Sequence, residues 1–162
     1  MNGDKVVRFK EAFKKQVGER AYLYEVNFHG CSQCLLLAFQ EILGLENELL
    51  FKAAGPLCAG MGAGLTCGAL TAGIMVIGTK IGRANIEEGN QVLLKGLEHT
   101  QKLVKVFKDK YGTTSCHELT KVDFSDEKQV NNFLNSPEKI EECCKRVGET
   151  AEMVAEIIAG LS

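Results

Sequence analysis

The chain of 162 residues is long enough to fold as a single domain, residues 1–162, around its own hydrophobic core. Its 19 basic and 21 acidic residues nearly cancel. No broad electrostatic field would therefore attract nucleic acid or an anionic membrane, and we expect neither as a partner. The most informative feature of the composition is the presence of seven cysteines, which points to redox or metal chemistry.

The first twenty residues predict an amphipathic helix and not a secretory signal. They mix Lys and Glu without a continuous apolar stretch, and Phe9, Phe13, Val17 and Ala21 follow helical spacing. We therefore expect a cytoplasmic protein. Because thiols stay reduced in the cytosol, an odd number of cysteines favours metal binding or thiol redox chemistry over a static set of disulfides.

A second helix is predicted from Cys31 to Leu45, where apolar side chains again repeat with helical spacing. It opens with a Cys-x-x-Cys pair, Cys31 and Cys34, directly after Gly30. The unpaired N–H groups and positive dipole end of a helix N-terminus should lower the pKa of a thiol placed there. The spacing alone fits a redox dithiol, half of a zinc site or two iron–sulfur ligands.

The glycine-rich segment that follows, residues 55–82, is not expected to bind a nucleotide. No predicted strand precedes it, and no Gly-Lys-Ser/Thr sequence follows. Residues 65–81 are apolar but fall short of the roughly 20 residues that cross a bilayer. We interpret them as a buried helix.

Three glycines in this apolar helix, Gly68, Gly73 and Gly78, are costly by helix propensity. Each loses about 1 kcal/mol relative to alanine. Some other group must therefore approach the helix backbone closely. It is either a neighbouring helix or a ligand held near Cys67.

Two long helices are predicted in the second half of the chain. Asn85 and Glu88 form a capping-box pattern that opens the first, and Gly112 ends it. Its inward side chains would be Leu93, Leu97, Val104, Phe107 and Tyr111. The second starts at Ser136 and Pro137 and runs almost to the end. With no convincing strand and no repeat, the predicted fold is all-α, a bundle of five to seven helices.

Covalent haem and a thioredoxin-like site are not expected. In the only Cys-His pair, Cys116 and His117, Thr113 stands where the first haem-linking cysteine should be. Thioredoxin chemistry needs a βαβ context that this chain does not offer. Of the adjacent pair Cys143 and Cys144, we place Cys143 inward, because it lies on the apolar stripe of its helix.

The order and context of four cysteines are the most specific pattern in the chain. The pattern comprises Cys31-Ser32-Gln33 at a helix start, Cys67-Gly68-Ala69-Leu70-Thr71 after a glycine-rich run, Cys116-x-Glu118-Leu119 after Tyr111-Gly112, and Cys143 in the last helix. It resembles the C-GCAxxG-C-C family of redox-active proteins over about Phe28 to Ile158. One departure is that the glycine expected at Ala72 comes one residue later, at Gly73.

The resemblance implies a redox role in which Cys31, Cys67, Cys116 and Cys143 are the functional cysteines, while Cys34, Cys58 and Cys144 are additional. The family is also similar to part of the split-Soret cytochromes, in which cysteines of this type are associated with an iron–sulfur site. No redox partner or substrate follows from the resemblance.

Three hypotheses remain open from the sequence. The first is electron transfer or redox sensing through an iron–sulfur cluster, [2Fe–2S], held by Cys31, Cys67, Cys116 and Cys143, with secondary candidate ligands in Cys34, Cys144 and His117. The second is a metal-free dithiol/disulfide oxidoreductase or switch, with pairs such as Cys31 and Cys67. The third is a structural zinc site of four cysteines.

The sequence also suggests two kinds of partner. A redox protein needs another protein as electron donor or acceptor, whose identity the sequence does not reveal. The small-residue helix around Gly73 offers a surface for close packing, so we expect a homodimer. No residue is recognisable as a general acid or base.

Overall fold

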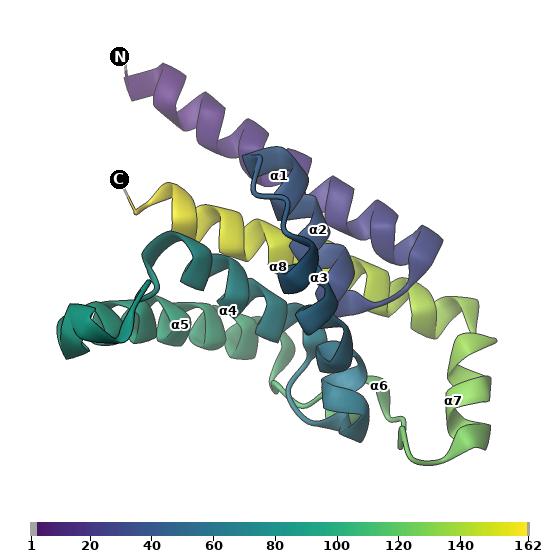
Figure 1. Cartoon of the computed structure of the whole chain (residues 1–162). Helices are drawn as coiled ribbons and strands as arrows, with labels where there is room; N and C mark the ends of the chain where they lie inside the picture. The colour runs from purple at the N-terminus through teal and green to yellow at the C-terminus, as the bar shows by residue number, and fades with distance from the viewer. Residues whose placement is uncertain (1–2, 162) are drawn as a thin grey trace.

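The computed structural model describes residues 3–161, and every regular element in that range is helical. Eight α-helices follow one another (Figure 1): α1 Gly3–Phe28, α2 Cys31–Leu43, α3 Glu48–Ala54, α4 Gly68–Ile81, α5 Gly89–Tyr111, α6 Cys116–Thr120, α7 Glu127–Leu134 and α8 Pro137–Ala159. Three shorter helical turns are η1 Gly55–Leu57, η2 Gly60–Gly64 and η3 Ile86–Glu88. The all-α class is confirmed. The eight helices are close to the five to seven expected, and three of them, α3, α6 and α7, are short.

The core forms where α1, α2, α4 and α8 pack together. α1 and α8 run antiparallel, so that both ends of the chain lie on the same side of the molecule (Figure 1). Gly148 of α8 permits this contact, because a Cβ atom there would lie 2.9 Å from the Gly18 carbonyl oxygen of α1. Phe39 and Phe107 are fully buried, and burial of such a side chain contributes about 1.5–3 kcal/mol. Within the described residues, no helix is both long and apolar enough to cross a bilayer.

The three glycines of α4 serve different purposes. A Cβ atom on Gly73 would lie 2.7 Å from Val154 and 3.0 Å from Leu103, so this glycine lets α8 and α5 pack closely against α4. Gly78 faces open space. Gly68 lies against a thiol, as described below. Because Gly73 is used inside the molecule, it offers no surface to a second copy, and the homodimer stays a prediction.

Most helix boundaries predicted from capping residues are confirmed. α8 begins directly after Ser136, and Gly112 ends α5 in the left-handed conformation with φ 79°. The helix predicted to reach Leu45 ends two residues earlier, because Gly44 is left-handed with φ 62°. Asn85 caps the short turn η3 instead of α5, which begins only after it.

Two members of the stripe predicted to face inward on α5, Leu93 and Leu97, are exposed. Leu103 and Phe107, further along the same helix, are fully buried. The first half of α5 reaches past the ends of the core helices (Figure 1). Helical spacing alone therefore identified the face but not how far along it the core extends.

The starts of α4 and α6 are tied together, next to the start of α2. The backbone N–H of Cys67 donates to the Thr114 carbonyl at 2.8 Å, and that of Cys116 donates to the Leu65 carbonyl at 2.6 Å. The Ser115 hydroxyl also reaches the Gly64 carbonyl at 3.1 Å. These bonds place cysteines that are far apart in the sequence at one end of the bundle.

Candidate functional site

Two glycines allow the cysteines to approach each other and the backbone. A Cβ atom on Gly68, the residue after Cys67, would collide with the Cys31 sulfur and would lie 2.9 Å from the Leu57 carbonyl oxygen. A Cβ atom on Gly60 would lie 2.8 Å from that of Cys116. At Gly68, therefore, the group that approaches the backbone of α4 closely is the thiol of Cys31.

Cys58 lies between η1 and η2 in the sequence, and its side chain lies against the N-terminus of α2. Its sulfur accepts hydrogen bonds from the Cys31 thiol and from the backbone N–H groups of Ser32 and Gln33. The Ser32 hydroxyl oxygen lies 2.9 Å from the same sulfur and 2.7 Å from the Ala54 carbonyl oxygen. Because that hydroxyl has one hydrogen, it can donate to either acceptor and can turn toward a Cys58 thiolate.

These hydrogen bonds, with the one from Cys31 contributing most, lower the pKa of Cys58 to about 5. Donating to Cys58, and then burial, raise the pKa of Cys31 well above its ordinary value. The prediction that the N-terminus of α2 activates a thiol therefore needs a correction. The thiol with the lowered pKa is that of Cys58, because the backbone N–H groups of Ser32 and Gln33 donate to its sulfur, whereas the hydrogen bond with Cys58 raises the pKa of Cys31.

The backbone beside Cys58 adopts conformations that L-residues rarely take. His29, Ala59 and Met61 all have positive φ, of 53°, 54° and 61°, and Gly30 has φ 113°. Residues other than glycine in this region cost of order 1–3 kcal/mol each and are concentrated at functional sites. The turns that bring Cys58 to α2 are thus held against their local preference.

Cys67 and Cys116 lie deeper than Cys58. Burial raises the pKa of Cys67, although its sulfur accepts hydrogen bonds from the backbone N–H groups of Ala69 and Leu70 at the start of α4. Burial also raises the pKa of Cys116 to about 12, and the nearby Cys67 adds to this rise. Both thiols are therefore neutral near pH 7.

A buried acid lies near two of the thiols, Cys34 and Cys143. Glu25 of α1 is 5% exposed, and one of its oxygens lies 4.0 Å from the Cys143 sulfur. Burial raises the pKa of Glu25. Burial also raises the pKa of Cys34 and of Cys143, and the Glu25 charge raises both further. The other Glu25 oxygen, Oε2, has no hydrogen-bond partner among the described residues.

A buried cation, Arg146 of α8, also lies near the thiols and is 9% exposed. Its guanidinium carbon lies 5.5 Å from the centre of the Tyr111 ring, and its Nε has no partner among the described residues. The positive charge of Arg146 opposes the rise that burial causes in the pKa of Cys67, Cys116 and Cys143. One buried acid and one buried cation are thus close enough to the thiols to shift their pKa values.

The remaining candidates lie at the edge of this group or outside it. Cys144, 1% exposed, is buried near Glu141 of its own helix, and burial raises its pKa to about 11. Cys143, which we predicted to face inward, is only partly buried, whereas Cys144 is buried. Cys143 nevertheless lies close enough to Cys67 and Cys116 for their charges to raise its pKa. His117 is held at 2.8 Å from the Val122 carbonyl oxygen.

The four cysteines of the predicted set, Cys31, Cys67, Cys116 and Cys143, lie close enough that the charge on one would raise the pKa of another. Across the part of the chain that the structure describes, however, no three His, Cys, Asp or Glu side chains are grouped so that they could hold a metal ion. Cys58 was missed as a site residue because nothing in its sequence spacing links it to Cys31. The one usable signal was the glycine-rich, turn-forming context around it.

Comparison with known proteins gives one match. Residues 29–157, most of the chain, match the sequence model of a protein family described as "Putative redox-active protein (C_GCAxxG_C_C)". No curated protein and no protein of solved structure matches the chain significantly.

Proposed function

The chain belongs to the C-GCAxxG-C-C family of redox-active proteins, and from this premise we propose that it works by thiol–disulfide exchange between Cys58, Cys31 and a partner. The observation that carries this proposal is the position of the two cysteines at the N-terminus of α2, where a Cβ atom on Gly68 would meet both the Cys31 sulfur and the Cα atom of Cys58, and where each thiol shifts the pKa of the other. Cys58 is only partly buried, whereas Cys31 is buried. This arrangement suits an attacking thiol and a thiol that resolves the intermediate.

The reaction with a disulfide of a partner protein has two steps. The Cys58 thiolate attacks one sulfur of the partner, the S–S bond of the partner breaks, and its second sulfur leaves as a thiolate. Cys31 then gives its proton to that thiolate and attacks the Cys58 sulfur. This step forms a Cys31–Cys58 disulfide and releases the other partner sulfur as a thiolate, which takes a proton from water, so that the partner leaves as a dithiol with two more electrons. A reducing thiol, as expected in a cytoplasmic setting, reverses the steps.

The residues around the pair favour this division of roles. The backbone N–H groups of Ser32 and Gln33 donate to the Cys58 sulfur and so stabilise its thiolate, the form that attacks the partner and that leaves when the steps are reversed. Gly68 leaves space for the Cys31 sulfur beside Cys67. Cys67 could therefore accept the disulfide from Cys31 in a further exchange, which would move the oxidation deeper into the bundle.

An iron–sulfur cluster on Cys31, Cys67, Cys116 and Cys143 is the second candidate, favoured by the convergence of these four thiols. The donors fit in kind and number, since four thiolates are the usual complement. The helix N-termini and Arg146 would compensate the negative charge of such a group. When bound, the cluster would supply one-electron transfer. We rank it second because the thiols would have to move together to bind it. A structural zinc ion would need the same movement.

Disulfide mapping by mass spectrometry, on protein purified without oxygen and then treated with one equivalent of a small-molecule disulfide, tests the proposal. We expect one Cys31–Cys58 disulfide and no loss of folded structure. The Cys58→Ser variant should form a mixed disulfide far more slowly, whereas Cys144→Ser should behave as wild type. Absence of this disulfide, together with stoichiometric iron and sulfide in the purified protein, would replace the proposal by the cluster. Stoichiometric zinc would replace it by a structural metal site.

A further inference from the structure

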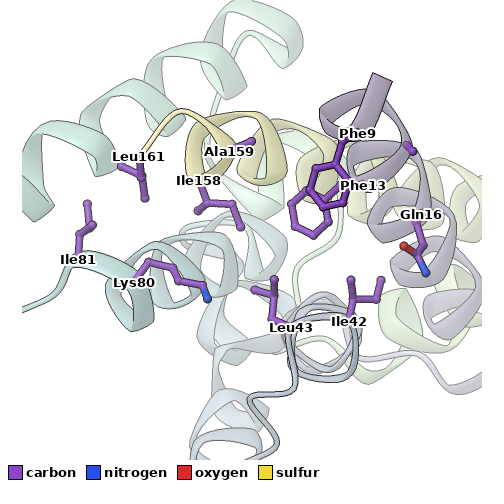
Figure 2. Close-up of a pocket in the computed structure, with 11 residues that line it drawn as sticks. Phe9, Phe13, Gln16, Ile42, Leu43, Lys80, Ile81, Ile158, Ala159 and Leu161 are labelled. Atoms are coloured by element: carbon purple, nitrogen blue, oxygen red, sulfur yellow. The ribbon is translucent and has the colours of Figure 1, made fainter. Parts of the chain in front are cut away.

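A large apolar cavity lies at the end of the molecule opposite the thiols. Its volume is about 700 Å³, and it opens between the first half of α1 and the last turns of α2, α4 and α8 (Figure 2). Its walls include the apolar side chains Phe9, Phe13, Leu43, Ile81, Ile158 and Leu161. Ligand pockets in proteins typically have volumes of roughly 300–1,000 Å³, with mostly apolar walls and a few polar groups.

The polar side chains in the lining are those of Lys80 and Gln16. The Lys80 amine points into the space between Leu43 and Ile158, and Gln16 lies on the far side of the cavity (Figure 2). Lys80 is exposed, and it is not among the eight Lys and Arg side chains that form salt bridges in the described part of the chain. An apolar cavity with one exposed cation in its lining is complementary to an apolar chain that ends in one negative charge.

We propose that this cavity binds an amphipathic monocarboxylate with an unbranched acyl chain, a fatty acid. The chain would displace water from the apolar walls of α1, α2 and α8, and the carboxylate would accept a hydrogen bond from the Lys80 amine. Phe9, which is 71% exposed in the free protein, would gain an apolar contact. This site lies apart from the thiols and goes beyond the redox function proposed above.

Lys80 and the apolar walls could each serve a different purpose, which the test must separate from fatty-acid binding. Lys80 lies in the last turn of α4, where a cation also compensates the negative end of the helix dipole. A second copy of the chain could likewise cover the exposed apolar side chains. If Lys80 only compensates the helix dipole, its substitution should not affect the binding of a carboxylate. If a second copy covers the apolar side chains, the protein should be a dimer in solution.

Isothermal titration calorimetry with laurate below its micelle concentration, compared with dodecan-1-ol, tests the proposal. We expect laurate to bind to one site and dodecan-1-ol to bind about tenfold more weakly, because the alcohol cannot form the charge-assisted hydrogen bond. Lys80→Met should weaken laurate binding about tenfold and leave the alcohol unchanged. Ala159→Phe, which fills the cavity, should weaken both, and Lys95→Met on α5 should change neither.

Three results would overturn the proposal. The first is no laurate binding by folded wild-type protein. The second is equal binding of laurate to wild type and to Lys80→Met, which would leave Lys80 with a role in helix capping only. The third is a dimer in sedimentation that Ala159→Phe abolishes, which would assign the cavity to a second copy.

Discussion

The N-terminal and C-terminal ends of α2 and α4 differ in how many structural constraints act on their residues. At the N-terminal ends, backbone N–H groups, positive φ angles and missing side chains are matched to individual sulfur atoms. At the C-terminal ends, the same helices present ordinary apolar side chains around a cavity. Function that depends on a pKa needs atoms fixed by several constraints at once, whereas apolar binding needs only volume and one charge. Mutations at the first end should therefore have the larger and more specific effects.

The largest expected effect is on thiol reactivity at slightly acidic pH. Cys58, whose pKa is lowered to about 5, is a thiolate at pH 6, and burial keeps the Cys34, Cys67, Cys116 and Cys143 thiols neutral. Cys58→Ser should therefore lower the rate of iodoacetamide alkylation at pH 6 on the order of a hundredfold. Alkylation followed by peptide mapping measures this rate. An unchanged alkylation rate in Cys58→Ser, with the label on another cysteine, would show that Cys58 is not the most reactive thiol.

The next effect compares two glycines of α4. Gly68→Ala should destabilise the protein by about 1–3 kcal/mol, because the new methyl group collides with the Cys31 sulfur and crowds the Leu57 carbonyl. The matched substitution Gly78→Ala meets no atom within 4 Å and should stabilise it by up to about 1 kcal/mol through helix propensity. Urea unfolding of both variants measures the difference. Equal effects would mean that the two ends of α4 are not differently constrained.

The smallest effect concerns the buried acid. Since the pKa of Glu25 is raised in the folded protein, its contribution to stability is fully present below the ordinary glutamate pKa and is lost as pH rises through the folded pKa. Glu25→Gln should therefore stabilise the protein at pH 7, on the order of 1 kcal/mol, and have little effect near pH 4. Urea unfolding at the two pH values checks this. A variant that is less stable than wild type at pH 7 would show that the Glu25 carboxylate is needed there in its charged form.

Local signals in the sequence predicted the helices well where a cap or a breaker decides the boundary. Ser136 with Pro137 and Gly112 mark their helix ends correctly, because a proline at the first helical position or a left-handed glycine acts within a few residues. Helical spacing predicted Leu93 and Leu97 to face inward, yet both are exposed. Spacing reports a face, and tertiary packing decides which part of that face is covered.

The candidate site was predicted only in part, for a related reason. The start of α2 was predicted to lower the pKa of its own cysteines, but the thiol whose pKa is lowered there, that of Cys58, comes from a segment 27 positions after Cys31. No local rule pairs a loop residue with a distant helix N-terminus. Glu25 and Arg146 were missed for the same reason, since isolated charged residues on amphipathic helices normally face solvent.

A pH titration of thiolate absorbance in the ultraviolet, on reduced protein and on its Cys58→Ser variant, tests most directly whether Cys58 is the activated thiol. We predict that wild-type protein contains one thiolate by pH 7, with a midpoint near the pKa of about 5, and that the variant contains none. Wild-type protein without a thiolate at pH 7, or a variant that retains one, would contradict this assignment.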